Sequence, residues 1–220
     1  TSFKGFIKDV LPYMDGLLVR NQGGARLAES FGKPFITDFG LNAMNNETVR
    51  FWKNEGALFV TLSPELNLSE IKTAGEEYSE LLGYGYMPLM LTHQCPIGNF
   101  AGGKKDSPFC SKTGEALSFT LKDKKGGIFY LKTDCRTCTC EILNGKPLFL
   151  LKFFDEVVDS PPEFMRLSFT IETGARTEEI MEAYAAMCKA PHDVDIRTDL
   201  LIKSMEENRS TKGHYFRGVE

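Results

Sequence analysis

The first ninety residues alternate short apolar runs with segments of helical character, and this alternation constrains the fold more than any other feature. The apolar runs lie in DGLLVRN (15–21), KPFITDFG (33–40) and ALFVTLSPE (57–65), and a helical segment follows each of them. Near-continuous apolar strands separated by helices are typical of a parallel sheet covered on both faces. We therefore predict an α/β fold, with a fourth strand either around residues 80–82 or in YMPLMLT (86–92).

Polar residues stand just past the predicted strand ends, namely Arg20, Asn21, Asp38, Asn42, Ser63 and Glu65. In a (β/α) barrel these positions form the catalytic rim, and a closed barrel needs about eight strand–helix units. The sequence supplies about half of that number. We expect residues 1–92 to form a partial TIM-like barrel that pairs with a missing N-terminal part or with a second subunit. A small open doubly wound sheet is the alternative. Because the chain starts at Thr1, we expect the C-terminal portion of a longer protein.

From residue 93 onward the pattern becomes β-rich. The segment LSFTLKDKKGGIFYLKT (117–133) predicts a hairpin around a Lys-Lys-Gly-Gly turn, and KPLFLLKFF (146–154) and RLSFTIET (166–173) predict further strands. We expect a cysteine-containing metal-binding β module over residues 93–152. A closing strand, helices and a basic aromatic tail are expected over residues 153–220.

Several helix ends are marked in the sequence. Asn46 is a candidate N-cap for the helix in NNETVRFWKNEG, and Thr177 is a candidate N-cap for the helix over 177–189. A second C-terminal helix is expected over 194–207. The apolar face of the 177–189 helix is expected to hold Ile180, Tyr184 and Cys188.

The composition is that of a globular protein, with 42% hydrophobic and 25% charged residues. No run of about eighteen apolar residues exists that could span a bilayer, and no signal peptide opens the chain. We therefore expect a cytoplasmic protein without a membrane segment. The net charge of −4 argues against a protein that coats nucleic acid over its whole surface, but it permits a local basic patch.

Four cysteines are candidates for one site: Cys95, Cys110, Cys135 and Cys138. The Cys-x-x-Cys pair lets two thiolates bind one metal from a tight turn. Four thiolates suit a tetrahedral zinc ion or a four-iron four-sulfur cluster, and the wide gaps favour the cluster. Cys140 is an alternative to Cys138 as a ligand. Disulfides are disfavoured without a secretory signal, and a buried core thiol is the reading that fits Cys188.

The run FGLNAMNNETVRFWKNEGALFVTLSPELNLSEI (39–71) resembles the barrel segment of the collagenase-like U-type peptidase family. That family's order continues through YGYMPLMLTHQCP, Cys110, LKDKKGGIFYL, DCRTCTCEILNGKPLFL and RLSFTIET, and the ending TKGHYFRGV is also similar. Members are named as proteases, yet relatives hydroxylate RNA bases or ubiquinone precursors with an iron–sulfur cluster on four cysteines. The resemblance implies that Cys95, Cys110, Cys135 and Cys138 hold such a cluster here. Their spacing departs from that of the best-known hydroxylating members and points to a variant branch.

The residues give little support to the protease name. A protease needs an activated nucleophile or a metal-bound water, and the chain has no His-Glu-x-x-His motif and no Gly-x-Ser-x-Gly motif. Ser63, near Glu65, has no histidine close by in sequence. Cys95 lies near His93, but four thiolates that bind a metal leave none free to attack. His93 is equally a candidate to support a cysteine ligand.

Two charged residues flank the predicted strand RLSFTIE. Arg166 and Glu172 fall on one face because their separation is even, and a guanidinium can bind a carboxylate or phosphate through two hydrogen bonds. A structural ion pair, between the two or with neighbours, is the alternative. No catalytic residue is assigned, and the candidates are His93, Glu65, Arg166 and Glu172.

Basic residues gather around the cysteines, at Lys104, Lys105, Lys122, Lys124, Lys125 and Lys132. The tail RSTKGHYFRGVE mixes cations with aromatic rings. Each feature also has a simpler explanation, a solvated loop face for the lysines and a docking role for the tail. We expect iron–sulfur-dependent RNA base hydroxylation, with RNA as the partner. The alternatives are a peptidase, or a non-catalytic scaffold with a structural zinc.

Overall fold

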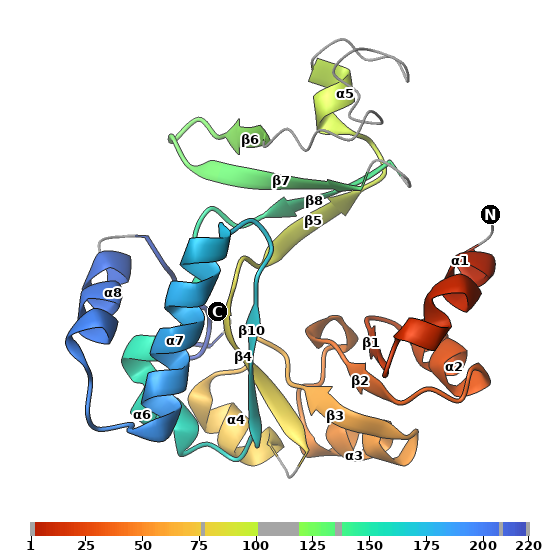
Figure 1. The fold of residues 1–220 in the computed structure, drawn as a ribbon, viewed down its shortest axis with the longest axis horizontal. Coiled ribbons are helices and arrows are strands. Elements are labelled where there is room, and N and C mark those ends of the chain that lie inside the picture. The colour runs from red at the N-terminus through yellow and green to blue at the C-terminus, as the bar shows by residue number, and fades with distance from the viewer. Residues whose placement is uncertain (1–2, 76–77, 101–118, 135–137, 207–208, 219–220) are drawn as a thin grey trace. The chain divides into compact units, whose positions relative to one another are not determined.

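The computed structural model describes residues 3–75, 78–100, 119–134, 138–206 and 209–218 (Figure 1). Its contacts divide the chain into two compact units. The first comprises Thr1–Gly83, Phe153–Arg166 and Lys212–Glu220, and the second comprises Tyr84–Lys152 and Leu167–Thr211. The predicted domain boundaries at residues 92 and 152 stay a prediction. Within the part of the chain described, no helix combines the length and hydropathy that a membrane crossing requires.

The first unit contains a parallel sheet. Its strands are β1 (Leu17–Val19), β2 (Phe35–Thr37), β3 (Ala57–Thr61) and β4 (Ser79–Gly85), with β10 (Phe164–Ser168) beside β4. Val19 pairs with Thr37, Thr37 with Val60, and Thr61 with Glu80. The predicted α/β class with a parallel sheet is therefore confirmed, and β4 and β5 show that both candidate fourth strands form. The described strands make an open sheet and no closed barrel. The partial TIM-like barrel remains a prediction.

Helices join these strands. They are α1 (Phe3–Val10), α2 (Gln22–Ser30), α3 (Asn46–Asn54), α4 (Leu68–Ala74) and α6 (Phe154–Val158), with 3-10 turns at Leu11–Tyr13, Phe39–Leu41 and Leu151–Phe153. The predicted cap of α3 is wrong by one residue. Asn45 is extended and its side chain accepts from the Thr48 N–H at 2.9 Å, while Asn46 is already helical. An N-cap needs a non-helical backbone, so the first of two adjacent asparagines takes the role.

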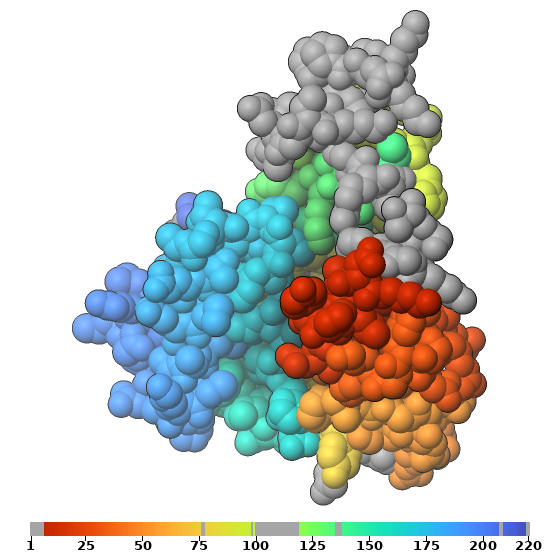
Figure 2. Space-filling model, turned by 45° about the vertical axis from the view of Figure 1, so that its right-hand side comes forward, coloured from red at the N-terminus to blue at the C-terminus, as the bar shows by residue number. Residues whose placement is uncertain are grey.

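The helices of the first unit bury one face each. In α3, Val49 and Trp52 are buried at a spacing of three residues, and in α4 Ile71 and Ala74 repeat that spacing. Residues three apart lie on one face of a helix, so these side chains pack together while the polar ones stay in solvent. Figure 2 shows residues 7–54 (red to orange) as one continuous body on the face in view.

The second unit contains an antiparallel sheet in the order β5-β8-β7-β6. Its strands are β5 (Pro88–Thr92), β8 (Thr139–Leu143), β7 (Ile128–Asp134) and β6 (Phe119–Lys122). The predicted hairpin is confirmed: β6 pairs with β7, and the Asp123 carboxylate accepts from the N–H groups of Lys125 and Gly127 in the turn. Strands β6, β7 and β8 lie within the β module expected over residues 93–152, whereas β5 precedes it. A metal-binding module of cysteines is not confirmed by this sheet.

The strand predicted over 146–154 is much shorter in the structure. Only β9 (Leu148–Phe149) forms, paired with the end of β4 through Tyr84 and Gly85. The next backbone N–H, that of Leu150, donates to the Tyr184 hydroxyl at 3.1 Å, and a 3-10 turn follows. The Leu150 N–H thus bonds to the Tyr184 side chain instead of continuing the pairing of β9 with β4.

Three helices complete the second unit: α5 (Pro96–Phe100), α7 (Gly174–Lys189) and α8 (Ile196–Glu206). Figure 1 shows α7 and α8 side by side. The N-cap of α7 is Thr173, whose hydroxyl accepts from the Arg176 N–H, so the prediction of Thr177 is wrong by one turn. The apolar stripe holds Ile180, Ala183, Tyr184 and Met187, whereas Cys188 is exposed. At 3.6 residues per turn, Met187 lies almost in line with Ile180, whereas Cys188 is turned about 80° away from Ile180 and lies in solvent.

Candidate functional site

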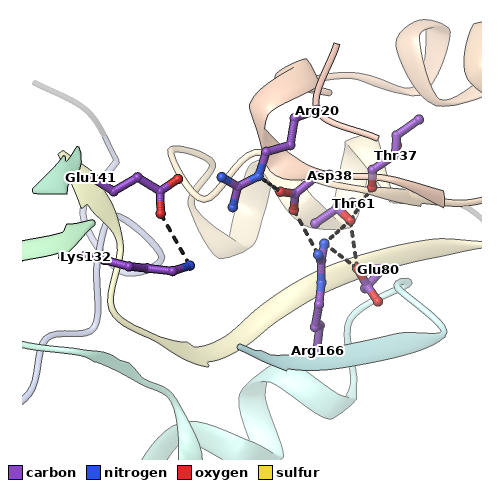
Figure 3. Close-up of polar contacts among 8 residues, drawn as sticks. All are labelled: Arg20, Thr37, Asp38, Thr61, Glu80, Lys132, Glu141 and Arg166. Carbon is purple, nitrogen blue, oxygen red and sulfur yellow. Dashed lines mark hydrogen bonds and ion pairs between the residues drawn. The ribbon is translucent and has the colours of Figure 1, made fainter. Parts of the chain in front are cut away.

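Arg166 is the centre of a polar cluster in the first unit. Its Nη1 lies 2.8 Å from Oδ1 of Asp38, and its Nη2 lies 2.7 Å from Oε1 of Glu80 (Figure 3). The side chains of Arg166, Asp38 and Glu80 are 17%, 0% and 13% exposed. Charges at this depth are tolerated only when they are paired. The guanidinium bridges both carboxylates and offsets one of their two negative charges.

The strand register brings these groups together. Asp38 directly follows β2, Thr61 ends β3, and Glu80 pairs with Thr61 across β3 and β4. The hydroxyl of Thr61 lies 2.6 Å from the Thr37 carbonyl and 2.7 Å from Oε1 of Glu80, and it accepts from Nη2 of Arg166. The cluster therefore sits at the carboxyl ends of β2 and β3. In open α/β sheets, ligands bind at that edge.

Arg20 is the most exposed member of the cluster. It follows β1, its Nε lies 2.5 Å from Oδ2 of Asp38, and its side chain is 51% exposed. Its guanidinium also lies 5.4 Å from the ring centre of Phe39. Two guanidinium groups thus offset two carboxylates, and the cation nearest to solvent is Arg20. Such an arrangement can orient an anionic group through the exposed guanidinium of Arg20.

The cysteines lie in the second unit. Cys95 follows β5, Cys138 directly precedes β8 with a positive φ of 55°, and Cys140 is buried inside β8. Cys140 pairs with Thr92 of β5, so this end of β8 and the end of β5 coincide. Burial, followed by the neighbouring thiol of Cys95 and the carboxylate of Glu141, raises the pKa of the Cys140 thiol. Three thiols therefore come from one end of the sheet.

The predicted ligand set extends beyond the described residues, because Cys110 and Cys135 lie outside them. No group of three histidine, cysteine, aspartate or glutamate side chains suited to a metal occurs among the residues that the structure describes. The four-cysteine site thus stays a prediction.

Comparison with models of known protein families identifies the family of this chain. The model of peptidase family U32 matches residues 12–218, almost the whole chain. The chain belongs to peptidase family U32. No match was found among curated proteins or among solved structures. The resemblance found in the sequence motifs is therefore confirmed for this U32 protein.

The U32 chain brings together some predicted site residues and separates others. Asp38 and Arg20, two of the polar residues that follow predicted strands, lie in contact, and Arg166 from within β10 binds Asp38. Ser63 is buried and its hydroxyl donates to Oδ1 of Asn42 at 2.7 Å. The exposed Glu65 contacts Ser63 only through its backbone N–H, at 3.4 Å.

Two further candidates, Glu172 and His93, belong to the second unit. Glu172 follows β10 rather than flanking it, and its Oε2 accepts from the N–H groups of Thr170 and Ile171 at 2.6 and 2.9 Å. Arg166 instead pairs with neighbours, which is one form of the ion pair that the sequence suggested. His93 is exposed beyond the end of β5.

Sequence reasoning missed Thr61 and Glu80. Glu80 carried a usable signal, because it is a lone charge among the buried residues of β4. A charge in such a run needs a cationic partner. Thr61 carried none, because threonine is common at strand ends.

Proposed function

We propose that this U32 family member acts in iron–sulfur-dependent hydroxylation of RNA bases. The observation that supports the proposal is the placement of Cys95, Cys138 and Cys140 at one end of the β5–β8 pair. Thiolates are the ligands that iron–sulfur clusters use in proteins. Cys95 and one of Cys138 and Cys140 would supply two of the four ligands, and Cys110 and Cys135 are expected to supply the other two.

The cluster, when bound, would supply electron transfer. The chain's own residues would have three tasks. Cysteine thiolates would hold the cluster, the sheet β5-β8-β7-β6 would keep their strand ends in register, and cations would bind the RNA. Lys122, Lys124 and Lys125 are exposed around the β6–β7 turn and suit phosphate contacts. In the first unit, the half-exposed guanidinium of Arg20 has the geometry to bind one phosphate.

The peptidase alternative agrees with the family's name. The hydrogen bond of Ser63 and the polar side chains around Arg166 argue against it. A peptidase of the serine type needs a free hydroxyl beside a base, but the Ser63 hydroxyl is buried and donates to Asn42. A pair of acidic catalytic residues shares a proton between carboxylates, but Arg166 lies between Asp38 and Glu80. A scaffold with a structural zinc, completed by another part of a barrel, is the remaining alternative.

The first experiment is metal analysis and visible absorption on anaerobically purified protein. About four irons per chain and a broad absorption band near the blue end are expected for a four-iron cluster. Cys135→Ser should lose both, while Cys188→Ser should keep them, because Cys188 is exposed on α7. Cys138→Ser and Cys140→Ser, compared side by side, decide which of the two thiols is a ligand.

A second measurement separates the three functions. RNA from cells that lack the protein, with and without the restored gene, is analysed by mass spectrometry for a mass increase of one oxygen on a base. Restoration of that increase by the wild-type protein, and not by Cys135→Ser, supports hydroxylation. One zinc per chain and no colour would favour the scaffold. Peptide cleavage that one side-chain change abolishes without loss of fold would favour the peptidase.

A further inference from the structure

A pocket of about 790 Å³ lies wholly within the second unit. Its walls come from the strand β7, the segment 144–147 before β9, the start of α7 and the region after α8. Sites for small ligands have volumes of about 300–1,000 Å³ and combine apolar walls with a few polar groups. The aromatic and charged side chains that line it include Tyr86, Tyr130, Glu172, Arg176, Lys146 and Arg209.

The carboxylate of Glu172 lies at one end of the pocket near the Tyr84 hydroxyl, whose pKa is raised chiefly by burial and then by the charge of Glu172. Oε2 of Glu172 accepts from two backbone N–H groups, whereas Oε1 is buried and has no hydrogen-bond partner among the described residues. Leaving such an acceptor unpaired is costly. A ligand that donates an N–H to this oxygen would remove the cost.

Tyrosine rings form a wall beside this carboxylate. The rings of Tyr86 and Tyr130 meet edge to face, with centroids 5.3 Å apart and planes at 77°. Burial raises the pKa of Tyr86 to about 12, and the negative charges of Tyr130 and Glu172 add to the rise. The Tyr86 hydroxyl is therefore neutral at physiological pH. An edge-to-face pair leaves ring surface available on which a planar ligand can stack.

Cations outnumber the anion around the pocket. Lys146, Arg176 and Arg209 line it together with one acidic residue, Glu172. Arg176 is held in place by Glu179 and by the sulfur of Met205, and Arg209 is exposed. The excess of positive charge favours a ligand that carries a negative group, such as a phosphate.

We propose that this pocket binds one unpaired nucleotide, with its base against Tyr86 and Tyr130, a base N–H donating to Glu172 and its phosphate near Lys146 and Arg209. The inference rests on the proposed action on RNA and assigns the place where a substrate nucleotide is held. Bases with an exocyclic amino group should bind better than uracil. The single N–H of uracil lies between two carbonyl oxygens, which a buried carboxylate repels.

The test is fluorescence anisotropy with labelled five-nucleotide RNAs, one series rich in adenine, cytosine or guanine and one of uracil alone. Tyr130→Ala should weaken binding by about 5- to 150-fold, the usual loss when one stacked base is no longer supported. Tyr130→Phe, which keeps the ring, should bind nearly as well as the wild type. Glu172→Gln should reduce the preference over the uracil series.

The phosphate contact has a matched control. Arg209→Ala should lower the slope of log affinity against log salt by about 0.7, the value for one phosphate of a single strand. Arg197→Ala removes the same charge from the exposed start of α8, outside this pocket, and should leave the slope unchanged. Circular dichroism and melting temperature establish that each variant is folded.

Competition with free nucleoside monophosphates distinguishes the two sources of such a ligand. Displacement of the RNA by millimolar monophosphate would assign the pocket to free nucleotides, and its absence would assign it to RNA. Equal binding by wild type, Tyr130→Ala, Glu172→Gln and Arg209→Ala would overturn the proposal. The binding assay does not require the iron–sulfur cluster. If these variants keep their iron and bind RNA as the wild type does, the proposed nucleotide pocket is refuted and the proposed function is not. Pocket-dependent binding by a protein without iron refutes the proposed function alone.

Discussion

Arg166 and Asp38 are 128 residues apart in the chain, yet Nη1 of the arginine lies 2.8 Å from Oδ1 of the fully buried aspartate. The contact joins β10 to the end of β2, two strands that are not neighbours in the sheet. The same guanidinium reaches Glu80 in β4. One side chain from the later part of the sequence thus compensates two acidic groups from the earlier part.

Removal of this cation should be severely destabilising. Arg166→Met is expected to lower the free energy of unfolding by about 3–5 kcal/mol, because it leaves buried carboxylates without their shared partner. Urea denaturation measures the change. Arg50→Met is the matched control, since Arg50 forms a half-exposed pair with Glu47 on α3, and such pairs contribute about 0.3–0.5 kcal/mol.

A double variant checks the mechanism of that loss. If buried charge is the cause, Asp38→Asn combined with Arg166→Met should be more stable than the sum of the two single changes predicts. Simple additivity would show that lost packing, rather than an uncompensated charge, explains the effect of Arg166→Met.

The first turn of α3 offers a comparison of two adjacent asparagines. Asn45→Ala should cost about 1 kcal/mol, because the Asn45 side chain accepts from the Thr48 N–H at the helix start. Asn46→Ala should be neutral or slightly stabilising, since Asn46 is helical and alanine is a better helix former. Thermal unfolding of the two variants gives the answer, and a larger loss for Asn46→Ala would contradict the observed cap.

Substitution of two buried tyrosines compares the stability cost of an unpaired backbone N–H with that of an unpaired backbone carbonyl. Tyr184→Phe leaves the buried N–H of Leu150 without the hydroxyl that accepts from it, and should cost about 1–3 kcal/mol. Tyr215→Phe removes a hydroxyl that donates to the Leu82 carbonyl at 3.0 Å. It should cost less, because an under-satisfied carbonyl is better tolerated than an unpaired N–H. Equal midpoints in urea for both variants would refute this distinction.

Stability should fall at high pH. The pKa of Tyr86 is raised to about 12 from an ordinary value of 10.0, chiefly by burial. The folded state therefore retains a proton that the unfolded state has lost, so the contribution is complete below about pH 10 and disappears as pH rises toward about 12. Melting temperatures measured from pH 9 to 12 should decrease. The decrease should be shallower in Tyr86→Phe and unchanged in Tyr13→Phe, because Tyr13 is 88% exposed.

The local order of elements could be read from the sequence. Apolar runs and helix signals place β1, α2, β2, α3, β3 and α4 in turn. Hydrophobic periodicity and the residues that end helices and strands are both properties of neighbouring residues. The Asp123–Gly127 turn could also be predicted from the sequence, because its hydrogen bonds are made within five residues. The helix starts were predicted less accurately. The N-caps of α3 and α7 are Asn45 and Thr173, where the sequence predicted Asn46 and Thr177.

The sequence by itself determined the family, the parallel α/β character and the candidate thiols, because each depends on residue types at short spacings. Only the tertiary structure decided the partners of Arg166, the end of β9 at Leu150 and the pocket around Glu172. A guanidinium can reach any carboxylate that the strand register brings within about 3 Å. That register is set by the packing of strands distant in sequence, so no local pattern encodes it.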